Sequence, residues 1–251
     1  MAVLTPGAAA DAASRQRSNQ HWSNAMQQHD PTERILVVGR ADLADLPAAG
    51  FLPCDRVVRR FLQSLGSRVH PMRRDVAERD PEHVQIVALA YVEHAGRLLV
   101  LPCDEGDASR ELYGKHAIWF GGHVEARDRS IVDGLRRELW EELGLPEGVL
   151  TAPELVGLVR NDATSRSTMH VGVVHRVRAL DTAITALARP ERMLVSGRYQ
   201  AEPISVETLW AQIGRLEPWS QFILRHLRSQ MAGIESSAAL QPAGTMVGGT
   251  M

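Results

Sequence analysis

Three glutamates lie close together in one short segment of the chain. Glu138, Glu141 and Glu142 stand at positions i, i+3 and i+4. If this segment is helical, with about 3.6 residues per turn, all three side chains project from one face of the helix. Carboxylates at this spacing repel one another by about 0.2–0.5 kcal/mol per pair, and the repulsion disappears when hard divalent cations bind among them. The spacing therefore predicts a metal site.

The residues around the glutamates predict a strand, a glycine loop and a helix. The apolar residues 118–120 precede Gly121 and Gly122, and Ser130 and Asp133 form the hydroxyl-x-x-acid pattern of a helix start. An apolar stripe runs beside the acidic one on the same helix, formed by Val132, Leu135, Leu139 and Leu143. Such a helix can pack on a sheet and present its carboxylates at the edge of a cleft.

The segment from Gly122 to Leu145 resembles the Nudix box, the signature of the Nudix (MutT-like) hydrolases. In the box, a glycine is followed by five residues, a glutamate, seven residues and the pattern Arg-Glu-aliphatic-x-Glu-Glu-x-Gly-aliphatic. Residues 137–145 match this pattern fully. In the first half, Asp128 stands at the position of the glutamate, and one residue is inserted before Arg137. We place the insertion in the loop near residues 127–130, because an extra residue in the helix would rotate all later side chains by about 100°.

The chain is also similar to a branch of this family described as predicted phosphoesterases. That branch carries a Gly-Gly-His box with an aspartate in place of the glutamate, as residues 121–128 do here. The similarity extends to residues 156–162, 170–172 and 219–221. The resemblance implies an α/β Nudix-type fold, in which a mixed β-sheet is sandwiched between helices, here with a small N-terminal extension.

The resemblance also implies the ligands and the reaction. Glu138, Glu141 and Glu142, with the carbonyl of Gly121, would bind two or three Mg²⁺ or Mn²⁺ ions, which prefer hard oxygen ligands. The reaction would be hydrolysis of a phosphoanhydride bond in a nucleoside diphosphate linked to another moiety. In the family, the residue at the position of Arg137 orients a glutamate of the site, and the alternative is direct contact with a substrate phosphate.

The loop before the helix holds three further candidates. Glu125 and Asp128 are either solvated loop charges or part of the site, where Asp128 would pair with Arg137 or act as an outer metal ligand. His123 directly follows Gly122, so it could touch the substrate.

The general base is either Glu138 or a residue from a later loop or strand. Asp162 and His170 are the downstream candidates. For His170 and His175 the alternative is a structural role, since histidines on strands commonly have hydrogen-bond partners within the fold.

Two other functions are compatible with this pattern. The fold could serve as a non-catalytic nucleotide-binding or regulatory module, which the insertion in the box could support. Isopentenyl diphosphate isomerases share the Nudix architecture and add a catalytic cysteine, and Cys103 follows a predicted strand before the box. The surrounding sequence does not resemble theirs, however, and all three helix carboxylates are kept. Hydrolysis is therefore the preferred interpretation.

The composition of the chain limits the classes of protein to which it can belong. With 251 residues and 44% hydrophobic composition, the chain can bury one large core with room for extensions. A formal net charge of -2 gives no electrostatic reason for binding nucleic acid or an anionic membrane. Two cysteines are too few for a disulfide scaffold. We expect a cytoplasmic protein that acts on a small-molecule nucleotide, and the resemblance makes a homodimer one oligomeric state to test for.

Four segments are expected along the chain: a disordered N-terminal tail (1–30), a small N-terminal extension (31–80), a Nudix hydrolase domain (84–230) and a disordered C-terminal tail (232–251). The extension should hold a strand at 35–38 and an amphipathic helix across 57–65. In the hydrolase domain we expect a hairpin (84–93 and 97–103), strands at 117–120, 155–160 and 169–177, and helices across 206–216 and from Pro218.

Overall fold

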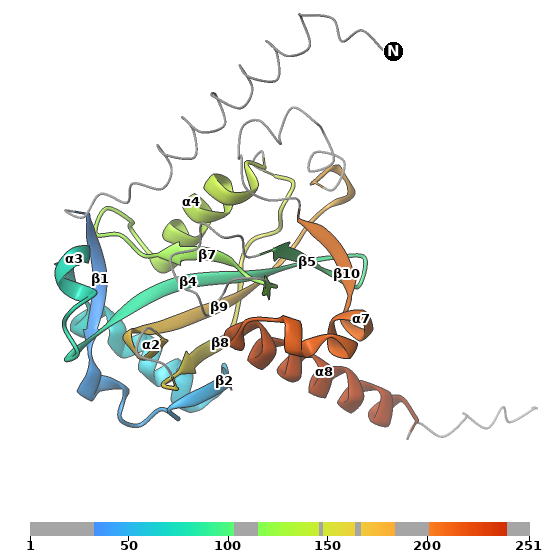
Figure 1. The fold of residues 1–251 in the computed structure, drawn as a ribbon, viewed down its shortest axis with the longest axis horizontal. Helices are drawn as coiled ribbons and strands as arrows, with labels where there is room; N and C mark the ends of the chain where they lie inside the picture. Colours follow the sequence, from blue (N-terminus) through green and yellow to red (C-terminus); the bar gives the residue numbers. More distant parts are fainter. Residues whose placement is uncertain (1–32, 103–114, 146–147, 164–166, 184–200, 240–251) are drawn as a thin grey trace, which may run out of the picture.

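The computed structural model describes residues 33–102, 115–145, 148–163, 167–183 and 201–239. The N-terminal tail expected at 1–30, Cys103 and residues 240–251 lie outside these ranges. Strands from the whole described chain join in one twisted sheet, with α4 (Ile131–Leu143) on one side of it and α8 (Pro218–Ala239) on the other (Figure 1). The mixed sheet between helices that the sequence predicts is therefore present.

The long strand β4 (His83–His94) is the centre of the sheet. One edge pairs in parallel with β9 (His170–Arg178), and the other edge pairs antiparallel with three shorter strands in turn: β1 (Arg34–Gly39), β7 (Phe120–His123) and β5 (Arg97–Pro102). The remaining strands extend the sheet outward. Beyond β9 lie β8 (Glu154–Asn161) and then β2 (Ala49–Pro53). On the other side, β10 (Glu202–Ser205) and β6 (His116–Ala117) pair with β5, and β3 (His70–Arg73) pairs with β1. β4 is buried continuously over residues 84–92, and apart from Gln85 its side chains there are hydrophobic on both faces.

Successive residues of β4 supply two hydrophobic cores, because side chains alternate between the faces of a strand. Ile86 and Ala88 point into the core under α4 and α2 (Arg56–Arg68), and Val87 and Leu89 into the core under α7 (Val206–Ala211) and α8. The glycine-bearing turn expected after residue 93 is also present. Ala95 and Gly96 both have positive φ, 47° and 74°, as a two-residue turn between antiparallel strands requires.

The N-terminal extension is built into this fold. β1 and β2 are strands of the main sheet, and α2 buries Val58, Phe61 and Leu65 in the same core as α4. Val57, which we expected in the buried stripe, is 50% exposed. The extension also contains the short helices η1 (Arg40–Leu43) and α3 (Arg74–Ala77). Elements of the N-terminal extension thus complete the sheet and the core on which α4 packs.

Three boundaries differ from the expected ones. Helix α8 begins at Pro218 as predicted but continues to Ala239, so the tail does not start at residue 232. The stripe across 206–216 is split into α7 and the 3-10 helix η3 (Ile213–Arg215), and a further short helix, η2 (Ser167–Met169), precedes β9. The strand expected at 117–120 is interrupted at Ile118 and Trp119, because the amide of Ile118 donates to Ser220 and the indole of Trp119 donates to Glu217. None of the described helices is long and apolar enough to cross a membrane.

The docking of α2 on the main core leads to a stability prediction. Phe61→Ala should lower the free energy of unfolding by about 3–5 kcal/mol, because the side chain is 7% exposed and its removal leaves a cavity. Val57→Ala on the same helix should change it by less than about 0.5 kcal/mol. Urea unfolding of both variants measures the two values. Equal, small effects would mean that α2 does not share the core.

Candidate functional site

Helix α4 carries the three glutamates and is held at both ends by its own sequence. The hydroxyl of Ser130 accepts a hydrogen bond from the amide of Asp133 at 3.1 Å, as the sequence pattern predicts. Gly144 ends the helix in the left-handed conformation, at φ 55°. The helix is unbroken from Ile131 to Leu143, so the inserted residue lies in the loop before it.

Glycine allows strand β7 to approach α4 closely. A Cβ atom on Gly122 would lie 2.5 Å from the carboxylate carbon of Glu138. On Gly121, with φ at 138°, it would lie 2.0 Å from the carbonyl oxygen of Ala88. The amide of Gly121 donates to the carboxylate of Glu142 at 2.9 Å. Two of the three helix glutamates are therefore packed directly against the glycine pair.

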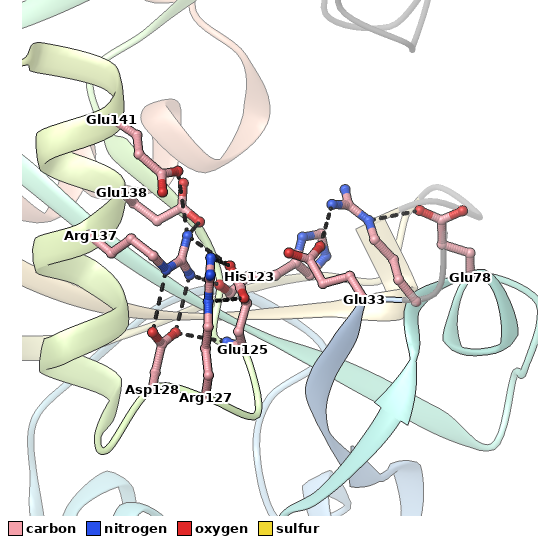
Figure 2. Close-up of polar contacts among 10 residues, drawn as sticks. Glu33, Glu78, His123, Glu125, Arg127, Asp128, Arg137, Glu138 and Glu141 are labelled. Atoms are coloured by element: carbon pink, nitrogen blue, oxygen red, sulfur yellow. Dashed lines mark hydrogen bonds and ion pairs between the residues drawn. The ribbon is translucent and has the colours of Figure 1, made fainter. Parts of the chain in front are cut away.

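Arg137 is the centre of the polar network at the start of the helix (Figure 2). Its guanidinium donates to the carbonyl of His123 at 2.9 Å and to Glu138 at 2.8 Å. It also forms ion pairs with Asp128 at 3.1 Å, Glu125 at 3.1 Å and Glu141 at 3.5 Å. Burial lowers the pKa of this guanidinium, but the hydrogen bond to Asp128 and the charge of Glu138 outweigh burial and raise it. This geometry fits the orienting role that the resemblance implies for Arg137, and Asp128 is its partner.

The side chain of Glu138 is 16% exposed, against 42% for that of Glu141. Burial raises the pKa of Glu138 to about 7, although the adjacent guanidinium of Arg137 works in the opposite direction. The carboxyl groups of Glu125, Asp128, Glu138 and Glu141 all contact Arg137, and in the described ranges a second cation, Arg127, binds Glu125 at 2.9 Å. Acidic oxygens thus outnumber cations, and this donor set fits hard divalent ions such as Mg²⁺ or Mn²⁺.

The three helix glutamates do not form a closed cluster in this conformation. Across the described ranges, no three side chains of His, Cys, Asp or Glu are grouped closely enough to hold a metal ion. Each carboxylate instead accepts from an N–H donor: Glu142 from the amide of Gly121, and Glu138 and Glu141 from Arg137. Repulsion among like charges explains why the acceptors separate. The convergence that we expected with the Gly121 carbonyl is therefore incomplete.

The histidine candidates from distant segments meet on the sheet. The rings of His123 and His170 lie 5.4 Å apart, because β7 and β9 pair with opposite edges of β4. His175, by contrast, is buried, and burial lowers its pKa. A ring nitrogen of His175 lies 3.2 Å from the carbonyl of Leu89, which gives this histidine a structural role.

Asp162 has a structural partner. Its two carboxylate oxygens accept from Arg160 at 3.1 Å and 2.8 Å, and Arg160 also donates to the carbonyls of Leu43 and Leu46. This pair ties the end of β8 to the loop after η1. Asp162 is therefore engaged in holding the fold.

Sequence reasoning missed the residues that reach the site from the N-terminal extension. Glu33 and Arg74 form an ion pair at 3.3 Å, and burial, followed by the charge of Glu125, raises the pKa of the Glu33 carboxyl. A shallow depression beside this contact is lined by Glu33, Arg34, Glu125, Ala126 and Arg127. Nothing local in the sequence marks these residues, because the contact joins positions that are far apart in the chain.

Comparison with known proteins identifies the fold. No protein-family model matches the chain. The chain is 26% identical over 202 residues to Protein YmaB of Bacillus subtilis (strain 168), an alignment that covers 76% of this chain and 96% of YmaB. The crystal structure of Tm1382, assigned as a Nudix hydrolase, superposes with a TM-score of 0.58 at 23% identity, over 78% of this chain and 98% of that one. A MutT protein from Methanosarcina mazei Go1 aligns over 59% of this chain and 94% of its own, at 20% identity and a TM-score of 0.41, which is too loose to carry an argument.

The superposition on Tm1382 shows that the chain has the Nudix-type fold. The fold predicted from the box is thereby confirmed.

The two glycines under α4 should respond differently to substitution. Gly121→Ala should lower the free energy of unfolding by about 3 kcal/mol, because the new methyl group meets a backbone carbonyl in a conformation that disfavours a side chain. Gly122→Ala should cost less than about 1 kcal/mol, since the atoms it meets belong to the mobile end of Glu138.

Denaturant unfolding measures both costs, and a crystal structure of Gly122→Ala should show the Glu138 carboxylate displaced from Arg137. A Gly122→Ala variant as unstable as Gly121→Ala would contradict this account.

Proposed function

We propose that the protein is a divalent-metal-dependent Nudix-type hydrolase that cleaves a phosphoanhydride bond in a nucleoside diphosphate linked to another moiety. One observation carries the proposal: Glu138 and Glu142 of α4 lie against the Gly121–Gly122 pair, and Glu141 shares Arg137 with Glu138, on a Nudix-type fold. A solvated helix face would have no physical reason to keep this repulsive group around one buried arginine.

The metal ligands of the proposal are Glu138, Glu141, Glu142 and the carbonyl oxygen of Gly121. Bound there, Mg²⁺ or Mn²⁺ supplies charge neutralisation on the phosphates and a water of lowered pKa. The side chain of Arg137 contributes orientation, because its ion pairs with Asp128 and Glu125 fix the guanidinium that contacts Glu138. Arg137 is thus proposed as a positioning residue, and its buried ion pairs leave little of it for a substrate phosphate.

The candidates for the general base differ in how free their side chains are to accept a proton. The carboxylate of Asp162 is occupied by Arg160, which makes it a poor base. Of the candidates left open by the sequence, Glu138 is proposed as the base, since it lies on the glycine pair at the proposed ion site. His123 and His170, which lie together on one face of the sheet, are proposed as contacts to the substrate.

A non-catalytic nucleotide-binding module is the second candidate. It is favoured by one observation, the absence of a closed cluster of metal ligands in the part of the chain that the structure describes. A panel of ADP-ribose, dinucleoside polyphosphates, NADH, coenzyme A and nucleoside triphosphates, incubated with Mg²⁺, separates the two. Release of a nucleoside monophosphate from at least one compound is expected, whereas tight binding with no product over many hours would support the binding module.

Activity should require Mg²⁺ or Mn²⁺ and the helix carboxylates. Glu141→Gln and Glu142→Gln should each lower kcat by about 100-fold or more, because each removes a charged ligand and keeps its shape. Asp133→Asn in the first turn of the same helix is the matched control, since this carboxylate pairs with the exposed Arg136 and takes no part in the Arg137 network. It should keep full activity.

All three variants should melt within a few degrees of the parent protein, because the substitutions leave the apolar stripe of α4 unchanged. Full activity in EDTA, or in both glutamine variants, would rule out the metal-hydrolase mechanism.

A further inference from the structure

The segment that leads into the glycine strand is bound to the start of α8. The amide of Glu217 donates to the carbonyl of His116 at 3.0 Å, and His116 and Leu216 form a parallel bridge. Two residues further along, the amide of Ile118 donates to the hydroxyl of Ser220 at 2.9 Å. Backbone and side-chain hydrogen bonds therefore join the two segments, although about 100 positions separate them in the chain.

Glu217 is a buried carboxylate that serves both segments at once. It precedes Pro218, the first residue of α8, and accepts from the amides of Trp219, at 2.9 Å, and Ser220, as an N-cap residue does. The same carboxylate accepts from the indole N–H of Trp119 at 2.7 Å. Its exposed fraction is 4%, and these three donors stabilise a charged group that burial alone would disfavour.

Capping of α8 does not by itself explain a glutamate at position 217. Serine, threonine, aspartate and asparagine are preferred before a first helical turn, because their short side chains reach the amides of that turn. The side chain of glutamate is one methylene longer than that of aspartate. Its Oε1 atom meets both the amide of Ser220 and the indole of Trp119. The contact with Trp119 therefore accounts for the length of this side chain.

Trp119 lies two residues before the glycine pair of the candidate site. The pairing of β7 with β4 begins only at Phe120, since the side chain of Trp119 is bound to the start of α8. Gly121 follows with φ at 138°, and its amide donates to the carboxylate of Glu142 at 2.9 Å. A local break in strand pairing, like a β-bulge, re-aims the residues that follow it. The contact of Trp119 with α8 thus sets where the glycine strand enters the site.

We propose that Glu217 is a positioning residue, which holds Trp119 against the start of α8 and thereby places the Gly121–Gly122 pair beside the helix glutamates. The inference rests on the proposed function for its effect on turnover. It adds to that function, because Glu217 lies outside the Nudix box and belongs to the side of the sheet opposite α4 (Figure 1). Glu217 acts on the proposed metal ligands through Trp119 and the backbone that follows it.

Two substitutions separate this role from the capping of α8. Glu217→Asp keeps a preferred capping residue but withdraws the carboxylate from Trp119, and Trp119→Phe removes the indole donor and leaves the cap in place. Each should lower kcat about tenfold and change KM by less than about twofold, since small displacements of positioned groups slow the chemical step. The double variant should be no slower than either single variant, because both changes remove the same contact.

The assay uses the panel compound from which the parent protein releases a nucleoside monophosphate fastest in Mg²⁺. Trp210→Phe is the matched control for the loss of an indole. Trp210 packs on the same core as Trp219, but it belongs to α7, and its ring lies under the guanidinium of Arg228. This variant should keep the parent kcat.

Hydrogen–deuterium exchange, measured without metal or substrate, reads the same role independently of activity. The amides of residues 119–123 should exchange faster in Glu217→Asp and Trp119→Phe than in the parent protein, and at the parent rate in Trp210→Phe. The first turn of α8 should keep the parent rate in all three variants, because its cap is retained.

This exchange pattern in a protein that hydrolyses none of the panel compounds would support the positioning role and overturn the proposed function. In an active enzyme, three results would overturn the positioning role and leave the proposed function standing. They are parent exchange in both variants, faster exchange with the parent kcat, and losses of kcat that add up in the double variant.

Discussion

The arrangement of the candidate site depends on one guanidinium. Arg137 gathers four carboxyl groups that would otherwise repel one another, two from the loop and two from its own helix. A lysine could not replace it well, because the planar guanidinium spreads five N–H donors over a wide, rigid group, whereas the compact ammonium of lysine has three donors on one nitrogen. The loop owes its conformation to the same contacts, since the carbonyl of His123 and the carboxylate of Asp128 both accept from Arg137. The acidic face of α4 can therefore persist as a partly buried surface.

The sheet provides the rigid support for this group. β4 pairs with β1, with the glycine strand β7 and with β9, so a single strand fixes the loop, the helix-facing glycines and His170 relative to one another. Its burial on both faces makes local distortion costly, because any shift disturbs two packed cores. Precise placement of catalytic side chains needs support of this kind. The site accordingly stands on the most buried strand of the molecule, although its acidic residues come from a helix and a loop.

The parts predicted correctly from sequence are those that local physics determines. The start of α4 at Ser130, its end at Gly144 and its apolar stripe follow from neighbouring residues, and so does the hairpin turn at Ala95 and Gly96. The joining of β1 to β4, the meeting of His123 with His170 and the bridge between Ile35 and Glu125 could not be predicted, since strand pairing brings together distant positions without a local signal. The spread of the three glutamates was also missed, because spacing on a helix fixes their face but not their rotamers.

The pairing of β1 with the loop couples two stretches of sequence that lie nearly ninety positions apart. A change at residue 125 alters the environment of residue 33, and the reverse is equally true, because the two residues stand at the paired backbone segments and line the same depression. Substitutions at these positions should therefore be inherited in compensating pairs, such as an acid with an amide, among chains that keep the longer loop. In related chains without the inserted residue, this dependence would be absent, and position 33 could vary independently of position 125. The inserted residue and the strand that holds it would then form a single evolutionary unit.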